Sequence, residues 1–188
     1  MMEGTCRASI FQTNIAYLKK KKGIEGLRFL DNYMQKQGLK LTTVQIEEMK
    51  PSEHVPLSSR VVFLEGCLAL FENDIEKLKA MGREAPSASL ILKLFIKYFV
   101  GPNSAINQAP PLWREHYSIG TLKVIKNEKG IGVLVLEDFN VSKIMCNYLC
   151  GYFEGVGILC RAKNTVCKET KCVHEGAEHC EFEITWDA

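Results

Sequence analysis

The apolar residues near the start of the chain recur at helical spacing. Residues 7–22 repeat apolar side chains every three or four positions, and Gly23 then interrupts this pattern. A second helix follows and ends near Gly38, because glycine commonly terminates helices. Residues 39–56 have mixed polarity and two prolines, so we expect an irregular connection there.

The middle of the chain is more apolar than its beginning. Residues 57–81 carry apolar side chains on more than one helical face, which predicts a central, buried helix. Pro86 suits the first turn of a further helix that extends to about Gly101. We expect a loop over 102–111, where three prolines occur.

The last third of the chain changes to strand-like patterns. Two short apolar runs flank a turn of the kind that closes a β-hairpin, and a second such pair follows a helix rich in apolar residues. Together with the helices before them, these patterns predict an α+β fold in which N-terminal helices pack on an antiparallel sheet of about four strands. The expected elements are strands 117–126 and 132–136, a helix 141–160, and strands 164–172 and 180–186.

Length and composition are those of an ordinary globular protein. The chain has 188 residues, of which 46% are hydrophobic and 24% charged, enough for one domain with a buried core. We therefore expect a single domain over 1–188, with a mainly helical half at 1–101 and a second half at 113–188. The net charge of +2 gives no reason to expect direct nucleic-acid binding.

The sequence predicts neither a membrane span nor secretion. The best apolar run, Leu90–Val100, is interrupted by Lys93 and Lys97 and is too short to cross a bilayer. No basic region followed by an apolar one marks a secretory signal, so we expect a cytoplasmic protein. In reducing cytosol, the eight cysteines are better explained as metal ligands and buried thiols than as disulfides.

Four residues in the second half are spaced like a closed metal site. Glu169 and Cys172 are three positions apart, Cys180 follows in the next strand, and Cys146 lies on the preceding helix. Three thiolates and a carboxylate fill a tetrahedral zinc ion and leave no open position for a catalytic water. The spacing thus predicts a structural zinc that clamps the C-terminal hairpin to the helix.

The spacing also permits other ligand sets. Cys150 lies one helical turn from Cys146, and Cys160 and Cys167 could join Cys172 and Cys180 in a site of four cysteines. A further alternative is that these thiols are simply buried, because free cysteine behaves as a small apolar residue.

The chain resembles the 4-vinyl reductase domain family over roughly residues 113–186. The ending E-T-K-C-V-H-E-G-A-E-H-C-E-F, the segment C-N-Y-L-C-G-Y-F-E-G and the strand W-R-E-H-Y-S-I-G-T-L-K-V are similar to motifs of that family. The resemblance implies zinc ligation by Cys146, Glu169, Cys172 and Cys180. It also implies a fold related to transport-particle subunits and to haem nitric-oxide domains, with a cavity for a hydrocarbon or aromatic ligand.

Three neighbouring residues are the best candidates for contacts with such a ligand. Trp113, His116 and Tyr117 combine aromatic surface with polar atoms that could orient an oxygen of the ligand. The helices before them are richer in apolar residues than one buried stripe requires, as expected of an apolar cavity. A haem held by His116 is conceivable, but nothing in the sequence singles it out.

These observations favour a sensory or regulatory module that binds a small apolar or aromatic molecule and is not an enzyme. The sequence contains no dinucleotide fingerprint and no nucleophile–base pair. We expect a homodimer and a separate signalling partner. The alternatives are an assembly or scaffold protein, like the transport-particle subunits, and a reductase-type enzyme of tetrapyrrole synthesis.

Overall fold

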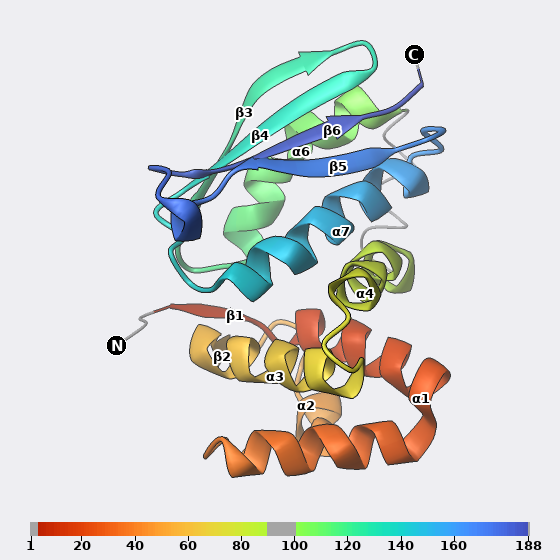
Figure 1. Ribbon diagram of the computed structural model, residues 1–188, viewed down its shortest axis with the longest axis vertical. Coiled ribbons are helices and arrows are strands. Elements are labelled where there is room, and N and C mark those ends of the chain that lie inside the picture. Colours follow the sequence, from red (N-terminus) through yellow and green to blue (C-terminus); the bar gives the residue numbers. More distant parts are fainter. Residues whose placement is uncertain (1–3, 90–100, 188) are drawn as a thin grey trace.

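A helical layer forms one end of the protein, and a four-stranded sheet with its covering helices forms the other (Figure 1). The computed structural model describes residues 4–89 and 101–187. The first end consists of β1 (Thr5–Arg7), α1 (Ala8–Lys36), α2 (Thr43–Glu48), β2 (His54–Pro56) and α3 (Leu57–Leu70). The second consists of α4 (Ile75–Ala88), α6 (Pro102–His116), β3 (Thr121–Glu128), β4 (Ile131–Glu137), α7 (Lys143–Leu159), β5 (Val166–Lys171), the short 3-10 helix η1 (Val173–Glu175) and β6 (Cys180–Thr185).

The helical layer agrees with the predicted pattern at its start and departs from it afterwards. Gly23 is non-helical, with φ 63°, and kinks α1 where the sequence predicts a break. The predicted irregular connection over 39–56 is wrong, because it contains α2 and β2. Thr42 and Gln45 form a reciprocal capping box that starts α2, and Asp31 of α1 accepts hydrogen bonds from Thr43.

The predicted central helix over 57–81 is divided into α3 and α4. Glu72 and Asn73 both adopt positive φ, which ends the first helix, and the Asp74 side chain accepts from the backbone of Glu76 and Lys77 at the start of the second. The Asn–Asp pair was the available signal, since both residues favour turns and N-caps. Because the chain turns here, α4 crosses to the sheet end and packs against α7 (Figure 1).

The prolines of the following segment have a different role from the one expected. The predicted loop at 102–111 is wrong, because Pro102 occupies the first turn of α6 and this helix continues to His116. Pro86 lies near the end of α4 and not at the start of a new helix. The remainder of the predicted helix, 90–100, lies outside the described residues.

The sheet confirms both predicted hairpins. Its strand order is β3-β4-β6-β5 and all neighbouring pairs are antiparallel. Leu122, Leu134, Phe182 and Ile184 lie on the face that is covered by α6 and α7. The α+β class, with N-terminal helices and a four-stranded antiparallel sheet, is therefore as predicted.

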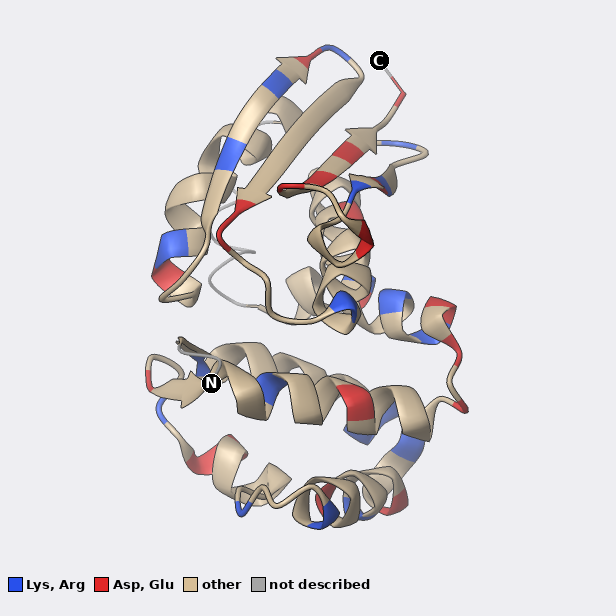
Figure 2. Cartoon of the chain, turned by 60° about the vertical axis from the view of Figure 1, so that its left-hand side comes forward, with Lys and Arg blue, Asp and Glu red and all other residues tan. Residues whose placement is uncertain are grey.

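Charge is distributed as expected for a sheet with one covered face. β3 carries Lys123 at an exposed position and Lys126 at a half-buried one, whereas β4 has no charged residue before Glu137 (Figure 2). Lys123 and Glu137 form an ion pair across these two strands on the open face. Within the described residues, no helix is both long and apolar enough to cross a membrane.

A buried arginine joins the helical layer to α7. Arg60 of α3 is fully buried, and its Nη2 donates to Asn14 Oδ1 of α1 at 2.6 Å. Asn14 Nδ2 in turn donates to the hydroxyl of Tyr148 on α7 at 3.0 Å. The guanidinium also lies over the rings of Tyr148, Phe11 and Phe63, at 4.7, 5.1 and 5.3 Å. Such contacts compensate part of the cost of burying a cation.

Glycines allow α4 and α7 to approach at backbone contact. A Cβ at Gly151 would collide with the carbonyl oxygen of Lys79, and one at Gly155 with that of Arg83. On α4, a Cβ at Gly82 would collide with the carbonyl oxygen of Tyr148. Gly151 and Gly155, four residues apart on α7, therefore form the face of this helix that packs on α4.

We expect Gly155→Ala to destabilise the protein by about 2–4 kcal/mol, because the added methyl group meets rigid backbone. Urea unfolding measures this difference. Ile158→Ala is the matched control, since Ile158 lies on the same helix and its side chain is 49% exposed. Equal stabilities for Gly155→Ala and the control would show that the two helices are not in backbone contact.

Candidate functional site

An apolar cavity of about 120 Å³ lies between the helical layer, α4, α6, α7 and the covered face of the sheet. It is the place where the two ends of the protein meet. The residues that line it are Ser9, Ile10, Thr13, Ala85, Ser89, Pro102, Ala105, Ile106, Ala109, Leu112, Trp113, His116, Tyr117, Leu122, Leu134, Tyr148, Leu149, Tyr152, Phe153, Val156, Gly157, Ile184 and Trp186.

The three ligand-contact residues named from the sequence all line this cavity. The rings of Trp113 and Tyr117 stack with centroids 4.1 Å apart, and Phe139 packs edge-on against both. The indole N–H of Trp113 donates to the carbonyl oxygens of Ile119 and Gly120, at 3.2 and 3.1 Å. The indole is therefore fixed in place, and its N–H is already used within the protein.

One ring nitrogen of His116 makes no hydrogen bond within residues 4–89 and 101–187. Its Nδ1 lies 2.9 Å from the carbonyl oxygen of Leu112, and a carbonyl can only accept a hydrogen bond. Nδ1 therefore carries the hydrogen, and in the neutral ring Nε2 is left as an acceptor. A hydroxyl or amide N–H of a bound molecule could donate to this atom.

The tyrosines of the cavity remain uncharged. Burial raises the pKa of Tyr117 well above its usual value, and burial also raises the pKa of Tyr148 and Tyr152. The lining contains no aspartate, glutamate, lysine or arginine among the described residues. A charged molecule would lose its hydration here without gaining a counter-ion, so the cavity suits an uncharged one.

The second predicted site is assembled as the spacing suggests. Cys146 lies in the first turn of α7, Glu169 on β5, Cys172 just beyond β5, and Cys180 at the start of β6. One ligand atom from each residue lies within 4.8 Å of the other three, and the three cysteines are each 1% exposed. The sulfurs of Cys146 and Cys180 are 3.7 Å apart. Tetrahedral coordination with metal–sulfur bonds of about 2.3 Å separates ligands by roughly 3.8 Å.

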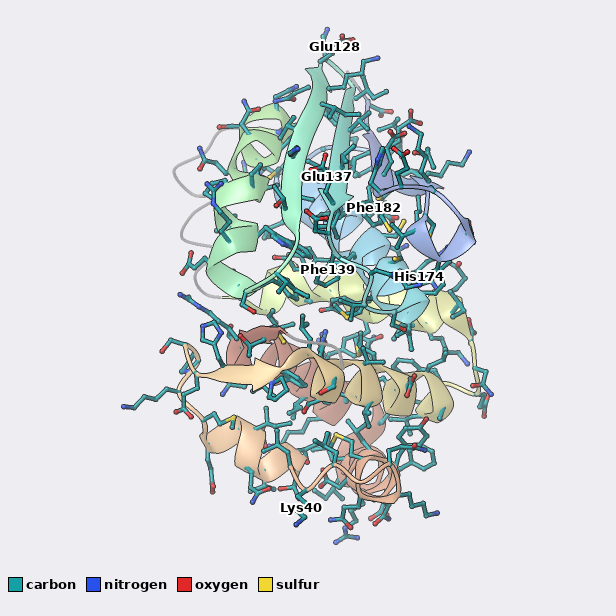
Figure 3. All side chains as sticks on the ribbon, turned by 90° about the vertical axis from the view of Figure 1, so that its left-hand side faces the viewer. Lys40, Glu128, Glu137, Phe139, His174 and Phe182 are labelled. Atoms are coloured by element: carbon teal, nitrogen blue, oxygen red, sulfur yellow. The ribbon has the colours of Figure 1, made fainter. Side chains whose placement is uncertain are left out.

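The turn after β5 is folded so that its residues close this cluster. Backbone N–H groups of Glu175 and Ala177 donate to the carbonyl oxygen of Cys172, and Gly176 adopts a left-handed φ of 91°. Figure 3 places His174 at the outer side of this turn and Phe182 on the strand that follows it. His174 is exposed and no contact of its ring with the cluster is recorded.

Charge in the cluster is only partly balanced by the protein. Glu169 Oε2 accepts from Lys143 Nζ at 2.9 Å, while Glu169 Oε1 is buried without a hydrogen-bond partner. A hydrogen bond from the Cys146 thiol lowers the pKa of Cys180 to about 7. A buried carboxylate oxygen without a donor is costly, and a cation at the centre of the cluster would satisfy it.

The alternative ligand sets do not assemble. Cys160 caps α7 away from the cluster, and Cys150 and Cys167 contact each other instead of joining the four residues.

Sequence reasoning missed the opposite wall of the cavity, made by Thr13 of α1 and Tyr148 of α7. These residues are far apart in the chain, and no local pattern marks them.

Comparison with known proteins identifies the fold. The sequence matches no protein-family model and no curated protein sequence. An H-NOX protein from S. oneidensis in the Fe(II)NO ligation state is 13% identical, with a TM-score of 0.71 over 97% of this chain and 99% of that one. An oxygen-binding H-NOX domain related to soluble guanylate cyclases is 11% identical, with a TM-score of 0.68 and coverages of 97% and 95%. An Fe(II) unliganded H-NOX protein from K. algicida is 10% identical, with a TM-score of 0.66 and coverages of 97% and 97%.

The chain thus has the fold of H-NOX domains, and two predictions are corrected. Membership of the 4-vinyl reductase domain family is wrong, because no family model matches and the structural neighbours are H-NOX domains. Structural zinc as the cofactor is also wrong, because these neighbours are described as iron and haem proteins. The cluster of Cys146, Glu169, Cys172 and Cys180 itself stays a prediction of metal ligands.

Haem, the group that this fold implies, does not fit the described residues. A cavity of about 120 Å³ is of the order of one that holds a single benzene ring, about 150 Å³, whereas a porphyrin has four pyrrole rings. Haem also carries two carboxylates, and the described lining offers them no cation. His116 and the tyrosines of the lining could serve as axial ligands, but the volume and the uncharged lining do not suit haem, so we assign no role to it.

Proposed function

We propose that this protein binds a small, uncharged, apolar or aromatic molecule in the cavity between its two ends, as a sensory or regulatory module. The observation that carries the proposal is the apolar cavity whose described lining contains no charged side chain. Ligand sites are commonly concave, mostly apolar and supplied with a few polar atoms that orient the ligand.

The polar atoms of the cavity support a ligand with one hydrogen-bonding group. Nε2 of His116 accepts, and the hydroxyls of Thr13 and Tyr152 are neighbours in the same lining. The apolar remainder of a bound ring would contact Leu134, Phe153 and their neighbours. A single ring with one hydroxyl therefore fits both the volume and the chemistry.

The position of the cavity supports a regulatory output. Tyr148 lines the cavity and also belongs to the Asn14–Arg60 network that reaches α1 and α3. A ligand that displaces the Tyr148 ring would change this network and the packing of the helical layer. A separate signalling partner could detect that change on the protein surface.

Melting temperature in the presence of three probes with a single benzene ring tests the ligand proposal. Benzene and phenol are expected to raise the melting temperature in proportion to the logarithm of their concentration, because they bind only the folded state. A concentration of about 100 Kd adds about 2.7 kcal/mol to the free energy of unfolding. Benzoate, which is charged at neutral pH, is expected to leave it unchanged.

Ala109→Phe fills the cavity and is expected to abolish the shifts. Ala109 lies on α6 in the cavity lining, whereas Ala16 is exposed on α1, so Ala16→Phe is the matched control. Absence of any shift with benzene and phenol, or an equal shift with benzoate, would contradict the proposal.

We also propose that Cys146, Glu169, Cys172 and Cys180 bind one thiophilic metal ion. The unpartnered Glu169 oxygen and the close packing of three sulfurs support this. The four residues come from α7 and from the hairpin β5–β6, so a bound ion would join these two elements.

Elemental analysis of the purified protein is expected to find about one transition-metal ion per chain. Cys172→Ser is expected to remove most of it and to lower the melting temperature, because metal binding contributes to folding. Cys160→Ser is the control, since Cys160 is a buried cysteine outside the cluster. Full metal content in Cys172→Ser Cys180→Ser would exclude these residues as ligands.

The expected homodimer has a candidate surface on the helical layer. Ile24 and Val44 are each 58% exposed and Phe29 is 43% exposed, on helices that the Asp31–Thr43 contact holds together. Apolar residues of this size are commonly covered in an oligomer.

Light scattering is expected to give twice the 21.2 kDa chain mass. Phe29→Glu is expected to dissociate the dimer into monomers. A monomer at micromolar concentration would contradict this.

A further inference from the structure

Cys150 and Cys167 form a second thiol pair that neither proposed site uses. Cys150 lies in the middle of α7 and Cys167 on β5, on the face of the sheet that α7 covers. The Cys150 thiol donates to the carbonyl oxygen of Cys167 at 3.1 Å. The two residues therefore already meet across the contact between helix and strand.

The pair lies at the base of a polar cleft. Cys150 and Cys167 are largely buried, 6% and 7% exposed, but both line this cleft of about 290 Å³. By contrast, Cys6 and Cys67 are fully buried in the core. The remaining lining of the cleft is Lys79, Lys143, Asn147, Lys168, Glu169 and Glu175. The cleft is the route by which a small polar oxidant would approach the sulfurs.

A disulfide between Cys150 and Cys167 would link two elements that already pack together. The residues come from elements that pack on one another, and disulfide formation needs neighbouring Cα atoms of about 4.4–6.8 Å separation with side chains directed at each other. A loop of 16 residues separates Cys150 from Cys167 in the chain, so the bond would close a local segment and leave the rest of the topology unchanged.

We propose that Cys150 and Cys167 are an oxidisable dithiol that closes to a disulfide when a hydroperoxide enters the polar cleft. This dithiol shares no cysteine with the ligand cavity or with the metal cluster, although its cleft also contains Glu169 of that cluster. It accounts for two cysteines that are otherwise unexplained.

The reaction balances with hydrogen peroxide as the oxidant. One sulfur attacks a peroxide oxygen, the O–O bond breaks, and a sulfenic acid and one water form. The second sulfur attacks the sulfenic sulfur, the S–S bond forms, and a second water leaves. The two thiols are oxidised by two electrons, the peroxide is reduced by two, and both thiol protons end in water.

The bond would restrain the strand that also carries Glu169. Glu169 lies two positions after Cys167 on β5 and faces the same helix. A disulfide at Cys167 would hold this part of β5 at a fixed distance from α7. The oxidised protein is therefore expected to resist local separation of hairpin and helix.

Tryptic mapping after exposure to hydrogen peroxide tests the proposal on the full chain as isolated. The intact mass should fall by about 2 Da, and two fewer thiols should react with iodoacetamide. Cleavage after lysine and arginine places Cys150 in peptide 144–161 and Cys167 in peptide 164–168. These two peptides should appear linked, and dithiothreitol should separate them.

Substitutions identify the sulfur within peptide 144–161, which also contains Cys146 and Cys160. The link should vanish in Cys150→Ser and in Cys167→Ser and should persist in Cys160→Ser. A link between peptides 144–161 and 172–188 would assign the oxidation to Cys146 and the hairpin cysteines and would overturn the proposal. So would no loss of mass, or the same link in Cys150→Ser.

Discussion

Backbone contact between α4 and α7 is the constraint on which the rest of the structure depends. Gly82 on α4 and Gly151 and Gly155 on α7 remove the side chains that would otherwise keep the two helices apart. Because α4 occupies this position, α7 has one side on α4 and another on the sheet. The helical layer is then joined to the sheet end through α7, and the cavity forms at the junction (Figure 1).

Helix α7 consequently serves several sites from different positions along its length. Cys146 in its first turn belongs to the thiol cluster, Cys150 one turn later contacts β5, and Tyr148 and Tyr152 face the cavity. Residues four positions apart lie on the same face of a helix. Cys146 and Cys150 therefore share one face of α7, and Tyr148 and Tyr152 share another. The face with the two tyrosines meets apolar residues of the sheet and of α6, whereas the face with the two cysteines meets the polar hairpin. The cavity and the cluster differ in chemistry for this reason.

Much of the fold could be predicted because its signals are local. The hairpins, the kink at Gly23 and the α+β class follow from periodicity and turn residues within short windows. The helix at 102–116 could not be predicted, because Pro102 starts it and Pro110 and Pro111 lie inside it. Proline outside the first turn normally indicates a loop.

The thiol cluster was predictable from spacing, whereas the far wall of the cavity depends on tertiary packing. The short motifs misidentified the family, since they cover a segment while the H-NOX likeness extends over 97% of the chain.

The buried Arg60 makes the two ends of the protein inseparable as folding units. Its guanidinium has two nitrogens without partners and depends on the ring of Tyr148, which belongs to α7, for one of its three aromatic neighbours. A fragment that stopped before α7 would keep the cation and its unpaired donors but would lose that ring and the hydroxyl that orients Asn14. Such a fragment would have to hydrate the arginine by opening its own core. Dissection of this protein into separately expressed halves would therefore yield a helical piece in a partly unfolded, expanded state.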